Sequence, residues 1–254
     1  MSRLTSWLAF YLFSLQFKFL VMIFPIGDDQ IKGGHKPYVS YTLIALNILV
    51  FFLQVTMPIG QQQSFVFDFG AIPVELTKGE DLYTLLTSMF LHGGWMHLIG
   101  NMLFLWVFAD NIEAVIGNFN FLMFYLLGGL AASIAHIVFN LGSGIPAVGA
   151  SGAISAVLGA YLMMFPKSKV KVFVAYIFRS FYMPALYFLG FWGVQQFVNG
   201  FITIIPRNDS THTSGVAWWA HIGGFIFGIV LGYFAKKMYT NQNGPGTAFN
   251  SPHV

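Results

Sequence analysis

The chain has 254 residues, of which 56% are hydrophobic and only 8% are charged, and its mean hydropathy is +0.69. Soluble domains average about 25% charged residues, so this composition indicates an integral membrane protein surrounded by the lipid bilayer. The formal net charge of +3 comes from basic residues spread over short loops, which argues against nucleic acid as a partner, and the absence of cysteine excludes disulfides, thiol catalysis and cysteine-based metal sites.

Residues 1–26 form an apolar N-terminal segment whose status the sequence leaves open. It has no small-residue cleavage motif of the kind that ends a removable signal peptide. The alternatives are an additional helix, an interfacial helix, or translated sequence upstream of a start at Met22. Residues 27–36 are polar and predict a loop before the first span.

Six apolar spans follow, each close to or above the length that crosses a hydrocarbon core of about 30 Å. They are Tyr38–Met57, Thr84–Ala109, Phe119–Asn140, Ser151–Phe165, Pro184–Ile204 and Val216–Ala235. We therefore predict an all-α, polytopic bundle of six transmembrane helices over residues 27–237, followed by a polar cytoplasmic tail at 238–254. The fourth span is short, which would seat its first residue below the membrane surface.

Basic residues predict the orientation of this bundle. Most of them lie before the first span, between the fourth and fifth, and after the sixth: Lys32, Lys36, Lys167, Lys169, Lys171, Arg179, Lys236 and Lys237. Two lie on the opposite side, Lys78 and Arg207. By the positive-inside rule both ends of the six-helix core are cytoplasmic, which puts the start of the fourth and sixth spans at the outer face.

Ser151 lies in the stretch AVGASGAISA at residues 147–156, where a Gly/Pro loop runs into an apolar helix. Gly149 and Gly152 flank the serine and leave its hydroxyl uncovered, so we assign them a supporting role. The start of a helix also supplies unpaired N–H groups and a partial positive charge of about half a unit, which can stabilise an oxyanion. For this motif alone, a small-residue packing surface in a membrane helix is the alternative.

His221 lies in AHIGGFIFG, about five residues into the sixth span, and an ionisable residue inside a membrane is by default a candidate functional group. Gly224, Gly228 and Gly232 recur every fourth residue after it. They line one helix face and permit a close approach to another helix. The matching small residues of the fourth span are Gly152, Ala156 and Gly159 or Ala160. This pairing predicts a hydrogen bond between Ser151 and His221, the alternative being a histidine bonded to nearby backbone.

The second span contains HGGWMHLIGN at residues 92–101. His97 and Asn101 are four residues apart, so they share a helix face, and both can donate a hydrogen bond while uncharged. A zinc site is disfavoured because His92 and His97 are five apart, no glutamate accompanies them and no third ligand is evident. We expect neither a metal nor another cofactor.

These three motifs, in this order, resemble those of the rhomboid intramembrane serine proteases of bacterial type, and the similarity extends over residues 24–237. The resemblance implies a multi-pass protein of a bacterial inner (plasma) membrane that cleaves single-span membrane proteins within or beside their transmembrane segment. It implies that Ser151 is the nucleophile and His221 its general base. The oxyanion donors implied are His97, Asn101 and the Ser151 backbone N–H, with His92 as a supporting residue.

The sequence departs from the family pattern in two places. Tyr83-Thr84 replaces the usual Trp-Arg pair, and Ser155 stands where some members have a tyrosine stacked on the histidine. Neither change removes a catalytic group.

No span carries Asp or Glu at the depth of the serine, so we predict a Ser–His dyad whose base is oriented by packing and tight helix contact. We do not expect the loop carboxylates of Glu80 or Asp209 to act as a third member. We interpret the polar residues of the third and fifth spans as structural: His136, Gln195, Gln196 and Asn199. The alternative functions are a non-catalytic, rhomboid-like pseudoprotease that binds membrane proteins, and a transporter, although the intramembrane acids and inverted repeats typical of transporters are absent.

Overall fold

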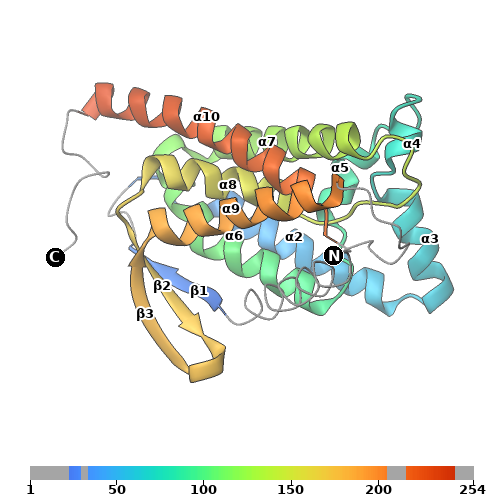
Figure 1. The fold of residues 1–254 in the computed structure, drawn as a ribbon, viewed down its shortest axis with the longest axis horizontal. Coiled ribbons are helices and arrows are strands. Elements are labelled where there is room, and N and C mark those ends of the chain that lie inside the picture. Colours follow the sequence, from blue (N-terminus) through green and yellow to red (C-terminus); the bar gives the residue numbers. More distant parts are fainter. Residues whose placement is uncertain (1–22, 30–33, 205–215, 244–254) are drawn as a thin grey trace, which may run out of the picture.

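The computed structural model describes residues 23–29, 34–204 and 216–243, most of which lie in a bundle of helices (Figure 1). The long helices are α2 (Tyr38–Thr56), α6 (Trp95–Ile116), α7 (Asn118–Phe139), α9 (Ala185–Ile204) and α10 (Trp218–Asn243). Shorter helical segments precede α6, namely α3 (Ile59–Phe69), α4 (Pro73–Leu76), α5 (Thr84–Thr87) and η1 (Ser88–Phe90). Met22, Asp209 and Arg207 lie outside the described residues, as do residues 1–21 and the tail from residue 244.

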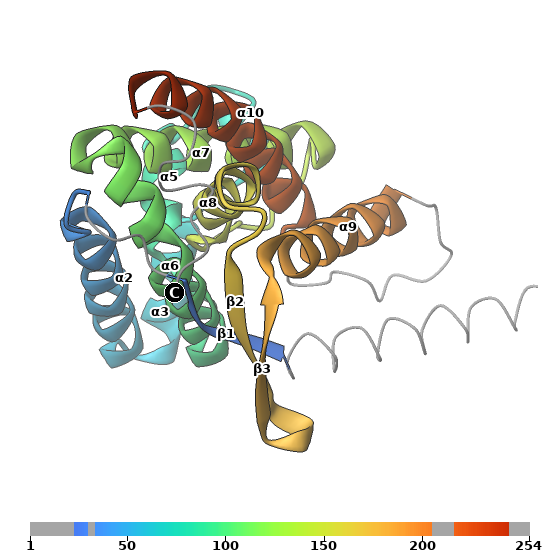
Figure 2. The ribbon, with the colours of Figure 1, turned by 90° about the vertical axis from the view of Figure 1, so that its left-hand side faces the viewer.

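Helix α8 (Ser151–Met164) occupies the centre of the bundle, where α6, α7, α9 and α10 pack around it (Figure 2). Eleven of its 14 residues are buried. The many small residues of α8 let neighbouring helices approach it closely, which suits a central position in a membrane bundle. Ser151 is its first residue and therefore lies at the end of the central helix.

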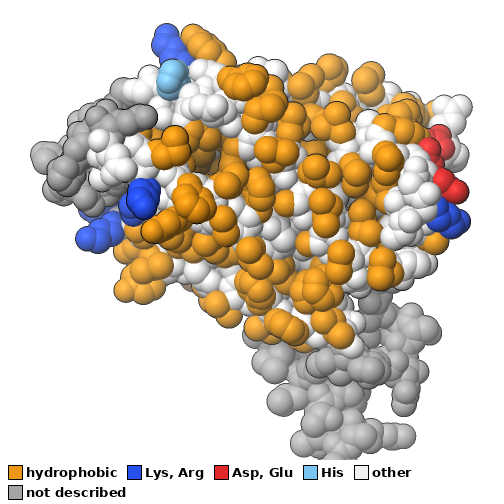
Figure 3. Space-filling model, turned by 90° about the horizontal axis from the view of Figure 1, so that it is seen from above, with side chains coloured by type: hydrophobic (Ala, Val, Ile, Leu, Met, Phe, Trp, Pro, Cys, Tyr) orange, Lys and Arg blue, Asp and Glu red, His pale blue; other side chains and the backbone are white. Residues whose placement is uncertain are grey.

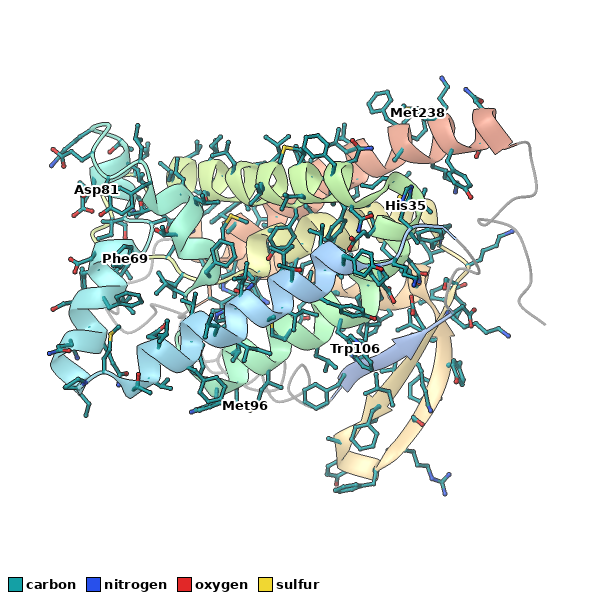
Figure 4. The ribbon with its side chains drawn as sticks, turned by 180° about the vertical axis from the view of Figure 1, so that it is seen from behind. His35, Phe69, Asp81, Met96, Trp106 and Met238 are labelled. Atoms are coloured by element: carbon teal, nitrogen blue, oxygen red, sulfur yellow. The ribbon has the colours of Figure 1, made fainter. Side chains whose placement is uncertain are left out.

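The surface and the helix lengths identify an integral membrane protein. Within the described residues, four helices are long and apolar enough to cross a bilayer, namely α2, α6, α7 and α10 as far as Asn241. Helix α9 has 20 residues but is not among these four, because its amide side chains lower its hydropathy. Figure 3 shows hydrophobic side chains over the middle of one face and charged ones at its two ends. Figure 4 labels two large apolar side chains of α6, Met96 and Trp106, which are 63% and 49% exposed. They lie between the two ends of the bundle, where His35 and Asp81 are labelled.

The prediction of an all-α fold is wrong in one region, because three strands form an antiparallel sheet in the order β1-β2-β3. They are β1 (Ile23–Asp28), β2 (Lys169–Val174) and β3 (Arg179–Pro184). Strand β1 crosses the boundary that we placed between residues 26 and 27. In β2, buried Val170 and Val172 alternate with Lys169 and Lys171, a strand pattern that we read only as a basic loop.

The second predicted span, Thr84–Ala109, is also corrected. It is divided into α5, η1 and, after an irregular stretch, α6, which continues to Ile116. Gly93 and Gly94 lie at the break, and glycine is a poor helix former because it loses the most backbone freedom on folding. His92 therefore precedes α6 instead of lying on it.

Strand β1 is joined to the bundle by a partly buried polar cluster. Asp28 accepts hydrogen bonds from the Tyr161 hydroxyl of α8 and from Asn111 Nδ2 of α6, the latter at 2.6 Å. Tyr161 is also 2.9 Å from Ser168 Oγ, just before β2. These bonds connect the far end of the central helix to the sheet.

The close approach of α8 and α10 is confirmed. A methyl group added at Gly228 would lie 1.9 Å from the carbonyl oxygen of Ala156, and one at Gly224 would lie 2.1 Å from that of Gly152. Gly232 packs in the same way on the next turn of α8. Only hydrogen atoms fit between these backbones, so the glycines set the separation of the two helices.

We expect Gly228→Ala to destabilise the protein by about 1–3 kcal/mol, because the methyl group must displace the α8 backbone. Gly190→Ala is the matched control, since Gly190 also lies in a helix but an added methyl group there meets nothing within 4 Å. Thermal unfolding of the two purified variants in the same detergent measures the difference. Equal unfolding midpoints would contradict the proposed packing role.

Candidate active site

Ser151 and His221 are brought together although 70 residues separate them in the chain. Ser151 begins α8, and His221 lies in the first turn of α10. Ser151 Oγ is 2.8 Å from His221 Nε2, a normal distance for an O–H···N hydrogen bond. The hydroxyl of a serine in this position can give up its proton directly to the imidazole ring.

The other nitrogen of the His221 ring has a side-chain partner that we did not predict. Gln196 of α9 places Oε1 2.8 Å from His221 Nδ1, and the side chain of Gln196 is buried. Packing and tight helix contact, which we expect to orient the ring, are therefore joined by a hydrogen bond to a side chain. The sequence signal for this contact is a buried amide within an apolar span, which the interpretation of Gln196 as a structural residue left out of the site.

Glu80, which we do not expect to act as a third member, is exposed and pairs with Lys78 at 4.0 Å. The hydroxyl of Ser155 donates to the Ser151 carbonyl oxygen at 2.6 Å and not to the His221 ring. His221 is bordered instead by the rings of Trp192 and Trp218, with centroids 6.0 and 6.1 Å from its own.

His97 and Asn101 lie on one face of α6 and point toward the loop before Ser151. A methyl group added at Gly149 would be 2.8 Å from His97 Nε2 and 3.6 Å from Asn101 Nδ2. The backbone N–H of Gly93 donates to His97 Nδ1 at 3.3 Å, so the ring proton is on Nε2. Asn101 Nδ2 is buried and has no hydrogen-bond partner among the described residues. Two uncharged donors thus converge on the backbone next to Ser151.

His92 lies against His97. Its side chain is completely buried, and its ring lies edge-on to that of His97, with 5.1 Å between centroids. Its carbonyl oxygen accepts a hydrogen bond from Gln54 Nε2 of α2 at 2.8 Å, a contact that the sequence did not suggest. Neither ring nitrogen of His92 has a partner among the described residues. Because burial disfavours a charged ring, we infer that His92 is neutral.

Gly152 is a packing residue. A methyl group there would lie 2.6 Å from Ala132 Cβ, so its small size lets α7 approach α8. A cavity beside Ser151 extends to α7 and is lined mostly by small side chains. Its polar lining residues are Ser151 itself, Ser88, Ser133 and His136. In the described ranges no three His, Asp or Glu side chains gather in a way that could hold a metal ion.

Comparison with known proteins adds independent information. The sequence model of a family described as "Rhomboid domain" matches residues 79–238. The chain is 35% identical over 197 residues to the rhomboid protease GluP of Bacillus subtilis, a match that covers 78% of this chain and 35% of that protein.

Eukaryotic proteins are also similar to the chain. It is 32% identical over 190 residues to RHOMBOID-like protein 4 of Arabidopsis thaliana, covering 72% of this chain and 42% of that protein. It is 25% identical over 215 residues to Rhomboid protein 1, mitochondrial, of Saccharomyces cerevisiae, covering 82% and 56%. The matched part therefore spans between about a third and just over half of the length of these relatives.

We expect Gly149→Ala to slow the reaction of Ser151 with a fluorophosphonate by at least about tenfold, the scale of losing one oxyanion donor being 10²–10³. Gly149 has φ +128°, which strains any L side chain, and its new methyl group would push against the His97 ring. Gly144→Ala is the control, since it lies in the same loop with open space around it. If Gly149→Ala and Gly144→Ala are labelled at the same rate, Gly149 does not shape the site.

Proposed function

Because the chain belongs to the rhomboid family, we propose that it is an intramembrane serine endopeptidase with Ser151 as nucleophile and His221 as general base. The observation that carries the proposal is the 2.8 Å hydrogen bond between Ser151 Oγ and His221 Nε2. A serine oxygen is a weak nucleophile unless an adjacent base removes its proton, and this geometry supplies the base.

The reaction is acyl transfer in two halves. Ser151 Oγ attacks the carbonyl carbon of a peptide bond, and its proton moves to His221 Nε2. The same proton then passes to the leaving nitrogen, which frees one product and leaves an ester on Ser151. Water attacks this ester and gives a proton to Nε2. Nε2 passes that proton to Ser151 Oγ as the ester bond breaks, which releases the second product with a new carboxyl group and regenerates the serine.

Negative charge on the carbonyl oxygen would be stabilised by uncharged donors. His97 Nε2–H and Asn101 Nδ2 point toward the loop before Ser151, and the first turn of α8 adds the N–H of Ser151 itself. The unpaired amide of Asn101 supports this role, because a buried donor without an acceptor is costly unless an acceptor arrives during the reaction.

The proposed membrane arrangement has six spans, with both ends of the core in the cytoplasm. Four apolar helices of spanning length support it, together with the enclosed α8 and the 20-residue α9. The basic residues around β2 and β3 and at the end of α10 would then face the cytoplasm, as the positive-inside rule requires. Ser151 would open toward the outer side.

The proposed substrates are single-span membrane proteins cut within or next to their transmembrane segment. A protease acts on extended chain, so a substrate helix containing Gly or Pro near the cut should enter more readily. Similarity to a bacterial protease at 35% identity supports a bacterial plasma membrane as the location, and the mitochondrial relatives make that organelle the alternative. A pseudoprotease is disfavoured because serine and base are both present and hydrogen-bonded.

We expect Ser151→Ala and His221→Ala each to reduce cleavage of a model single-span substrate by about 10³-fold or more, since either change removes the activated nucleophile. Ser151→Ala should also abolish labelling by a fluorophosphonate. Purified protein in detergent is suitable, with Ser64→Ala on the exposed face of α3 as the control. Parental rates in both active-site variants would exclude the proposed enzyme.

We expect His97→Ala and Asn101→Ala each to slow cleavage by about 10²–10³-fold while Ser151 still reacts, more slowly, with the fluorophosphonate. The double variant should lose less than the product of the two single losses, because both donors serve one oxygen. Steady-state cleavage rates of the three variants measure this. If both single variants cleave at the parental rate, backbone N–H groups alone form the oxyanion site.

A further inference from the structure

The hydrogen bond between Gln196 and His221 has a direction that the structure determines. Gln196 Nε2 donates to the backbone carbonyl oxygen of Trp192, one turn earlier in α9, at 3.1 Å. A carbonyl oxygen can only accept, so the amino group of the glutamine must face it. The glutamine oxygen Oε1 therefore faces His221.

The direction of this bond determines the tautomer of the histidine. Oε1 of an amide can only accept a hydrogen bond, so His221 Nδ1 must carry the ring proton. Nε2 is then unprotonated, and it is the atom that lies 2.8 Å from Ser151 Oγ. The hydrogen bonds thus run in one direction: Ser151 Oγ–H donates to His221 Nε2, His221 Nδ1–H donates to Gln196 Oε1, and Gln196 Nε2–H donates to the Trp192 carbonyl. The lone pair of Nε2 therefore faces the serine hydroxyl.

No other described contact makes this distinction between the two ring nitrogens. The tryptophan rings beside His221 restrict the plane of the imidazole, but an apolar surface does not discriminate Nδ1 from Nε2. Ser155 cannot contribute because its hydroxyl is bonded to the Ser151 carbonyl oxygen. The nearby ionisable side chains, His97 of α6 and His136 of α7, have other partners in the described structure: the Gly93 N–H and Asn140 Nδ2.

We propose that Gln196 is a positioning residue, the neutral third member of a Ser151–His221–Gln196 arrangement. Its role rests on the proposed protease function. Gln196 holds the reactive tautomer before the reaction and keeps accepting from Nδ1–H when the ring takes up the serine proton. An amide does this without a fixed negative charge, which would be costly to hold inside an apolar bundle.

Gln196→Leu tests the proposal, because leucine fills a similar volume but accepts no hydrogen bond. In Ser–His–Asp enzymes a wrong tautomer costs about 10⁴-fold in kcat. In Gln196→Leu the ring proton can occupy either nitrogen, so the reactive tautomer is still populated and the loss should be smaller, about 10- to 100-fold. We expect this loss in kcat with KM unchanged, and a parallel loss in the fluorophosphonate labelling rate. A contact that only stabilises the fold would not confine its effect to kcat.

Two further variants separate positioning from folding. Gln195→Leu is the matched control: it makes the same change at the neighbouring buried glutamine, whose Oε1 has no partner among the described residues. It should cleave at close to the parental rate. Gln196→Glu should recover most of the rate lost in Gln196→Leu, since a neutral carboxyl group, the form favoured by burial, can accept from Nδ1–H and donate to the Trp192 carbonyl.

The outcomes decide between the alternatives. A loss of kcat in Gln196→Leu that Gln196→Glu restores, in proteins with parental unfolding midpoints, supports the proposal. It is overturned if Gln196→Leu cleaves like the parent, if Gln195→Leu loses as much, or if Gln196→Glu fails to restore the rate while remaining folded. A parental protein that neither cleaves nor reacts with the probe would instead refute the proposed function itself.

Discussion

The contact between α8 and α10 is the constraint on which the rest of the structure depends. Glycines at every fourth position of α10 let its backbone lie against the carbonyl groups of α8, with no room for a methyl group. This separation sets the distance between the first residue of α8 and the first turn of α10, and therefore the 2.8 Å between Ser151 and His221. Small residues have this effect in membranes because the hydrophobic effect does not drive helices together in lipid. Close backbone contact instead supplies the van der Waals attraction between them.

Around this contact the polar groups of the site are neutral. Serine, two histidines, asparagine and glutamine can exchange hydrogen bonds without placing a net charge among apolar side chains. Several carboxylates lie toward the ends of the bundle: Glu80 is exposed beside Lys78, and Glu113 accepts from the backbone and hydroxyl of Ser40 where α2 begins. The carboxylates thus lie where solvent or several donors stabilise them, Glu113 being buried among its donors, and away from the uncharged groups of the site.

The sheet matters to the site because it holds the other end of the central helix. Tyr161 of α8 hydrogen-bonds to Asp28 of β1 and lies beside Ser168, while β2 and β3 connect α8 to α9. The helix that carries Ser151 is thus anchored by glycine contacts along its length and by polar bonds at its end. Helix α9, which carries Gln196, starts directly from β3.

The sequence by itself determined the membrane class, the approximate positions of the apolar helices, and the glycine pairing that unites Ser151 with His221. These features are local: hydropathy, helical period and motif order can each be read within one segment. It also identified His97 and Asn101 as neighbours, because residues four apart share a face of any helix.

The tertiary structure decided what depends on contacts between distant segments. Strand β1 pairs with residues more than 140 positions later, so it could be found only once β2 was in place beside it. The break at Gly93 and Gly94 turned His92 into a buried support for His97. Gln195 and Gln196 are alike in sequence, and only the packing of α9 against α10 selects which amide meets the histidine, because neighbouring residues on a helix point about 100° apart.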